Sequence, residues 1–208
     1  MQACNDMGND RQAGLHEMGT DSTYFFAPGA RPFNPHLTPK QLANQEKFGE
    51  NNAKWFDQFG YPYFTREVYD EFYPGYGASW PWFYGGIGMT YENASVRGLL
   101  AERRDGNLYP YIQSVHKHFL ASVSTCESAA NRRAELLDAF YDYQVSSLDK
   151  AKSEPVKAWV LPRRGDTSLV DKLAIQLADQ GVEVKKARDS FALDGKTYPA
   201  GSYVINVA

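Results

Sequence analysis

Cysteine is scarce in this sequence of 208 residues. Only Cys4 and Cys126 are present, which is too few for a disulfide framework. We expect two free thiols, with a single bridge between them as the alternative. Cys126 falls within a helical pattern, so we expect it to lie in the core.

Long apolar runs and runs of one charge are also missing. No stretch approaches the ~20 apolar residues that a membrane-spanning helix needs, and no apolar segment follows Met1 as in a signal peptide. The net charge is -3, and the arginine pairs at 103–104, 132–133 and 163–164 stand alone. These features argue against a membrane span and against nucleic acid as a partner, since nucleic acid requires a basic patch.

Apolar and aromatic residues are plentiful, at 43% and 14%, enough for the core of one sizeable domain. A helix is predicted from Pro39, because Thr38 can cap it and Gln41 completes a capping box. A second, short helix is predicted over 66–72. Apolar residues at helical spacing predict a long helix over 111–148, with a break near Cys126 where serine and threonine gather.

The composition shifts at 150–155, and the pattern beyond it alternates between strands and a helix. Strands are predicted at 158–161, 182–184 and 202–207, a helix from Asp166 to Gly181, and a hairpin turn at 193–196. We therefore divide the chain into a main domain over 1–150 and a small α/β extension over 155–208, and we predict the α/β class.

Two residues that suit hydrolytic chemistry lie in separate sequence segments. His16 lies in Leu-His-Glu-Met-Gly at 15–19, and Glu92 ends a predicted strand at 88–92. Burial among aromatic residues would raise the pKa of Glu92 and suit it to proton transfer. More ordinary roles remain open: a histidine in a hydrogen-bond network, and a carboxylate held by backbone amides or by Arg97.

A loop rich in aromatic residues and glycine covers 73–88 and is either core packing or the wall of a binding site. His116 and His118 form a poor metal pair, because residues two apart on a helix point about 200° apart.

In the segments that contain His16, Glu92 and the aromatic loop, the chain resembles the zinc carboxypeptidases of the carboxypeptidase A type, in particular their bacterial branch. The resemblance covers about residues 13–148, the C-terminal half of that catalytic domain. It implies a partial mixed sheet flanked by helices, a zinc cofactor, a peptide substrate, and a periplasmic or secreted location. The small extension resembles one that follows the catalytic domain in some of these proteins.

The resemblance also assigns roles to individual residues. His16 matches a zinc ligand, and Glu92 matches the glutamate that activates the zinc-bound water. Tyr73 matches the mobile tyrosine that closes over the substrate, with Tyr76 as a rival. Ser79 and Trp80 would line the pocket for the terminal side chain of the substrate.

The family's first two zinc ligands lie in a His-x-x-Glu motif, and no histidine here has a glutamate three residues later. The family's arginines and asparagine for the substrate carboxylate are missing too, and Gly14 stands where the branch has an acidic residue. One imidazole does not make a catalytic zinc site. We therefore expect the chain alone to bind zinc weakly, to hydrolyse no peptide, and to expose an unpaired sheet edge.

Two other functions compete with the peptidase. The first is a non-catalytic module that binds peptides or cell-wall fragments through the aromatic loop. The second is a glycoside-binding or glycoside-cleaving protein, for which Asp70 or Glu71 would have to be a second carboxylate ~5–9.5 Å from Glu92.

Overall fold

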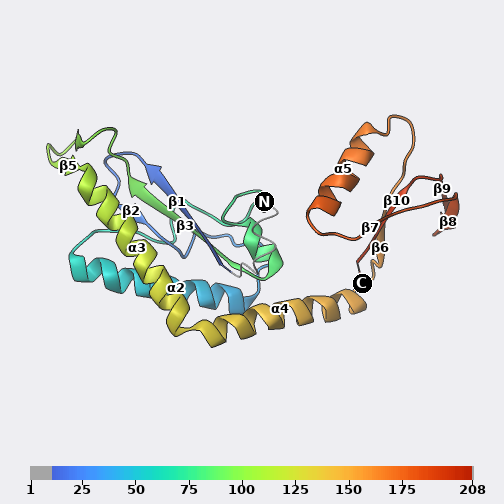
Figure 1. The fold of residues 1–208 in the computed structure, drawn as a ribbon, viewed down its shortest axis with the longest axis horizontal. Helices are drawn as coiled ribbons and strands as arrows, with labels where there is room; N and C mark the ends of the chain where they lie inside the picture. The colour runs from blue at the N-terminus through green and yellow to red at the C-terminus, as the bar shows by residue number, and fades with distance from the viewer. Residues whose placement is uncertain (1–10, 208) are drawn as a thin grey trace. The chain divides into compact units, whose positions relative to one another are not determined.

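The computed structural model describes residues 11–207. The chain divides between Gln144 and Val145 into two compact units, each with its own helices and sheet (Figure 1). The sequence predicted this boundary at 150–155. In the structure, a helix over residues 133–153 spans the position where the two units meet. The mixed helix and sheet content agrees with the predicted α/β class in its general form.

The first unit is built on a three-stranded sheet in the order β1-β3-β2. Strand β1 (Arg11–Met18) pairs in parallel with β3 (Ile87–Ala94), and β2 (Tyr24–Phe25) pairs with β3 in antiparallel orientation. Strand β3 is therefore central, and seven of its eight residues are buried. Within residues 11–207, β1 pairs with β3 alone and is a sheet edge.

Helix α2 (Pro39–Phe59) begins with the predicted capping box and ends at Gly60, which adopts a left-handed conformation. Thr38 Oγ1 accepts from the Gln41 amide, a cap worth about 1 kcal/mol. The buried face of α2 carries glutamines: Gln41 donates to the carbonyls of Trp82 and Gly86, and Gln45 donates to that of Gly88. These bonds hold residues 82–88, which follow the loop at 76–79 that forms one wall of the cleft described below.

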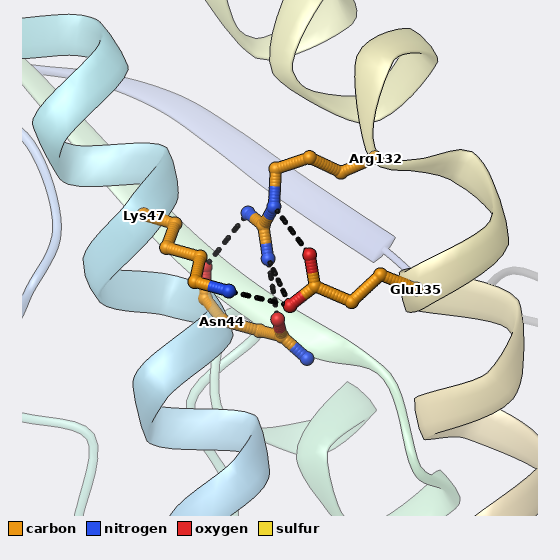
Figure 2. Close-up of polar contacts among 4 residues, drawn as sticks. All are labelled: Asn44, Lys47, Arg132 and Glu135. Atoms are coloured by element: carbon orange, nitrogen blue, oxygen red, sulfur yellow. Dashed lines mark hydrogen bonds and ion pairs between the residues drawn. The ribbon is translucent and has the colours of Figure 1, made fainter.

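The predicted long helix is two helices, α3 (Tyr111–Asn131) and α4 (Arg133–Ser153), which meet at Arg132. No break occurs near Cys126, because Ser122 and Thr125 donate to the carbonyls four residues back and fit within the helix. At the junction, the Arg132 guanidinium contacts Asn44 of α2 and the Glu135 carboxylate, which also accepts from Lys47 at 2.6 Å (Figure 2). This network ties the helix turn to α2.

Helices α2 and α3 cover one face of the sheet. Tyr91 of β3 points to that side, where its hydroxyl contacts Asn52 of α2 at 3.1 Å and Thr125 of α3 at 2.6 Å. The largest side chains of this core are fully buried: Tyr24, Phe26, Phe48, Phe56, Trp82, Met89 and Tyr91. Residues of β3 that alternate with these, Thr90 and Glu92, face the opposite side of the sheet.

Between α2 and β3 the chain is mostly irregular. The helix predicted over 66–72 is wrong: Arg66 and Val68 have positive φ angles of 62° and 65°, which no right-handed helix contains. A short 3-10 helix, η1 (Trp80–Tyr84), leads into β3. A hairpin of β4 (Leu100–Glu102) and β5 (Leu108–Pro110) connects β3 to α3.

The second unit, after Gln144, contains the antiparallel sheet β6-β10-β7 and the helix α5 (Ser168–Asp179). Its strands are β6 (Ala158–Leu161), β7 (Val184–Lys186) and β10 (Tyr203–Asn206), close to the predicted positions. A hairpin of β8 (Phe191–Leu193) and β9 (Lys196–Tyr198) turns at Asp194-Gly195, where both φ angles are positive, as the sequence predicted.

Cys126 has a free and exposed thiol, so its expected place in the core is wrong. It lies on the outer side of α3, and Cys4 lies outside the described residues. Among residues 11–207, no helix has the length and apolar character needed to cross a membrane.

Candidate functional site

The two motif residues are neighbours across a pair of strands. His16 of β1 and Glu92 of β3 are partners in the parallel register, although 76 positions separate them in the sequence. Paired residues of parallel strands project from the same face of a sheet. His16 is exposed on the edge strand, whereas Glu92 on the central strand retains only 9% of its accessible surface.

Both side chains line one cleft of about 540 Å³ on the sheet face that α2 and α3 leave uncovered. Three parts of the chain form this cleft: the sheet, the irregular segment after α2, and the loop before η1. The lining residues are Gly14, His16, Val68, Tyr69, Asp70, Tyr76, Gly77, Ala78, Ser79, Thr90 and Glu92. A volume of this size is ordinary for a small-molecule site.

Gly14 leaves space for the imidazole. It precedes His16 by two residues and therefore lies on the same face of β1. A Cβ at position 14 would stand 2.7 Å from His16 Nε2, closer than real Cβ contacts allow. The glycine at position 14 therefore permits the observed imidazole position.

Burial raises the pKa of the Glu92 carboxyl, and the nearby His16 imidazole partly offsets that effect. Glu92 in turn acts on its surroundings, because its charge adds to the desolvation that raises the pKa of Tyr69. The raised carboxyl pKa has the direction that suits proton transfer, as expected from the sequence.

The aromatic loop contributes only some of the predicted residues. Ser79 lines the cleft, and so does Tyr76, the rival of Tyr73. Tyr73 and Trp80 are not among the lining residues: Tyr73 is 59% exposed and meets the Tyr76 ring edge-on, and Trp80 packs on Tyr84. The loop contributes both to the core, where Trp82 is fully buried, and to the cleft, which residues 76–79 line. The sequence spacing did not show which tyrosine lines the cleft.

Residues 68–70 form another wall of the cleft, within the segment where the sequence predicted a helix. Val68, Tyr69 and Asp70 line the cleft, and Val68 holds a left-handed φ that is rare for a β-branched residue. A bridge between Ala30 and Asp70 fixes this wall to the chain after β2. Asp70, considered as a second carboxylate for glycoside cleavage, thus shares the cleft with Glu92.

The histidines of α3 have structural partners. Tyr61 meets Nδ1 of His116 at 2.8 Å, and Tyr24 meets Nδ1 of His118 at 2.9 Å. These bonds connect α3 to two different parts of the first unit, as expected for residues that diverge on a helix.

The side chains of residues 11–207 do not complete a metal site. No three His, Cys, Asp or Glu residues in that range lie together as a metal ion would require. A catalytic zinc takes three protein ligands, and His16 supplies one imidazole. Zinc therefore fits this cleft only with ligands from outside the described residues.

Comparison with known proteins matches the chain to no protein-family model, no curated protein and no solved structure.

Proposed function

We propose that the first unit is part of a metallocarboxypeptidase-like catalytic domain, which hydrolyses peptide bonds with a zinc-activated water. One observation carries the proposal: His16 and Glu92, the two motif residues, are register partners that line the same cleft.

In this proposal His16 would be one ligand of a zinc ion that activates the water, and Glu92 would accept a proton from that water and pass it to the leaving amine. Ser79 contacts the terminal side chain of the substrate. A tyrosine of the loop closes over the substrate, and Tyr76 is better placed for this in the present arrangement than Tyr73. Trp80 would reach the substrate only if the loop moves.

The zinc ligands other than His16 would come from polypeptide outside residues 11–207. We expect the 208-residue chain by itself to bind zinc weakly and to show no peptidase activity. A tight complex of one zinc per chain, measured by calorimetry, would contradict this expectation.

Zinc titration followed by NMR tests the role of His16. Zinc should perturb the imidazole resonances of His16 before those of His116 and His118, whose Nδ1 atoms already contact tyrosines. His16→Ala should abolish this first response, and His36→Ala, which removes an exposed histidine outside the cleft, should leave it intact. A first response at any other histidine would sink the assignment.

Testing the role of Glu92 requires a longer protein in which a His-x-x-Glu motif precedes this chain. Sequencing the source locus upstream of Met1 shows whether one exists. In such a protein Glu92→Gln should remove nearly all turnover while zinc stays bound. Retained turnover would show that another residue accepts the proton.

A non-catalytic binding module is the second candidate. Two observations favour it. The described residues form the walls of the cleft, but they do not supply the three ligands of a metal site. Binding of peptides that is indifferent to zinc and to Glu92→Gln would support the module over the enzyme.

A further inference from the structure

The ionisable side chains of the cleft are mainly acidic. Asp70 and Glu92 supply two carboxylates, His16 supplies one imidazole, and the lining contains neither lysine nor arginine. Such a lining attracts a cationic group of a ligand.

Asp70 is held in a fixed position on the cleft wall. Its Oδ1 accepts from the backbone amide of Phe72 at 2.9 Å, and the bridge to Ala30 restrains its backbone. The bond to Phe72 engages one oxygen of the carboxylate and leaves Oδ2 to accept from a ligand. A carboxylate fixed in this way gives an ammonium or guanidinium group a charge-assisted hydrogen bond without further ordering.

Ser79 provides an independent sign of a ligand. It is fully buried, it lines the cleft, and its Oγ has no hydrogen-bond partner among the described residues. A buried hydroxyl without a partner is costly, and such groups are few in native structures. A donor on a bound ligand would satisfy this oxygen.

Apart from His16, the lining residues suit an organic cation. Tyr69 and Tyr76 are among the lining residues, and aromatic rings attract ammonium and guanidinium groups. A metal ion would need several oxygen or nitrogen ligands at close range, and no such group occurs among residues 11–207.

We propose that the cleft binds an ammonium or guanidinium group of its ligand, with Asp70 as the charge partner and Ser79 Oγ as the buried hydrogen-bond acceptor. The inference rests on the proposed function, in which this cleft binds a peptide substrate. It narrows the substrate class to peptides whose C-terminal residue has a basic side chain. Free amines carry the same chemical group, and the experiment below separates the two sources.

The test is an NMR titration of the 208-residue chain without zinc, using N-acetyl-glycyl-lysine, its norleucine analogue, and n-butylammonium. The lysine peptide should shift the amides of Asp70 and Ser79 and bind about tenfold more tightly than the norleucine peptide. Tighter binding of the lysine peptide than of n-butylammonium assigns the cation to a peptide. Equal binding of these two assigns it to a free amine.

Three variants make the test specific. Asp70→Asn keeps an acceptor for the Phe72 amide and should remove the preference for the lysine peptide over the norleucine peptide. Ser79→Ala should weaken lysine binding several-fold. Asp138→Asn, the same charge change at an exposed position of α4, should have no effect.

Equal affinity for lysine and norleucine, or a lysine preference that persists in Asp70→Asn, would overturn the inference. Because neither zinc nor turnover enters the measurement, its failure is separate from that of the proposed function. Loss of the zinc response at His16 would remove the peptidase proposal and leave the cation site in place.

Discussion

Glu71, next to Asp70, shows how strongly a single buried side chain responds to its surroundings. It is 4% exposed; its Oε1 accepts from Gln45 at 2.5 Å, and its Oε2 has no partner among the described residues. Burial raises the pKa of Glu71 to about 8, with a small further increase from Asp70, although the bond from Gln45 opposes the shift. The folded protein therefore keeps this carboxyl protonated at neutral pH.

This carboxyl makes stability depend on pH. The unfolded chain releases the proton near the ordinary value of 4.5, whereas the folded chain holds it up to about 8. Between these values the folded state binds more protons, so the free energy of unfolding falls as pH rises, by at most ~1.4 kcal/mol per pH unit. Glu71→Gln should remove the part of this decline that Glu71 causes and should be more stable than the parent at pH 8.

Urea unfolding at pH 5 and pH 8, followed by near-ultraviolet circular dichroism, measures the effect of Glu71→Gln. Glu50→Gln serves as the control, because Glu50 is exposed on α2 and should leave the pH dependence unchanged. Equal pH dependence in the parent and in Glu71→Gln would show that Glu71 is ionised in the folded state.

At the scale of elements, the sequence predicted what local patterns determine. The start of α2 was predicted from Thr38, Pro39 and Gln41, because a capping box needs no tertiary contact. The turn at Asp194-Gly195 was likewise predicted from local backbone preference. The helix predicted over 66–72 failed, because a tertiary bridge at Asp70 and positive φ angles at Arg66 and Val68 replace the local preference. Tyr69 and Val68 were missed as lining residues for the same reason, and Asp70 was considered only as a second carboxylate for glycoside cleavage.

The site itself was predictable only in part. His16, Ser79 and Glu92 were chosen from motif strings, and all three line the cleft. Tyr73 and Trp80 were chosen from the same strings, but the turn of the loop directs Tyr76 inward instead. Which of several neighbouring aromatic side chains faces inward depends on loop geometry that spacing does not encode.

Strand β3 depends on a glycine at its start. A Cβ at position 88 would lie 1.6 Å from the Ala78 carbonyl oxygen and 2.9 Å from Trp82 Nε1, so strand and loop touch directly there. Gly88→Ala should force them apart and lower the free energy of unfolding by about 2 kcal/mol or more. Thermal unfolding measures this, and Gly19→Ala, with nothing within 4 Å of the added Cβ, is the control. A change at position 88 no larger than at position 19 would disprove the close contact.

At the scale of the whole molecule, the division into two units was visible in the sequence as a change of composition, but its position was not. Helix α4 continues from the first unit into the second, and its residues follow one helical pattern through the boundary at Gln144. Composition changes only where the helix ends, after Ser153. A boundary inside a helix leaves no such sign in the sequence.

The exposed edge of the first sheet governs how the whole molecule behaves at high concentration. Strand β1 has eight residues, and within residues 11–207 it pairs on one side only. Leu15, at its centre, is 51% exposed. A long unpaired edge with an apolar side chain invites a strand from another molecule. We therefore predict that the chain self-associates with increasing concentration.

Leu15→Lys should suppress this association, because a lysine on the edge strand would have to lose its hydration and meet its own copy when two edges pair. Sedimentation velocity over a concentration series measures the effect. Leu99→Lys is the matched control: Leu99 is 83% exposed and lies outside β1, so the same change in charge and hydropathy occurs away from the edge. Suppression by both variants alike would attribute the association to general surface hydrophobicity, whereas suppression by Leu15→Lys alone locates it at β1.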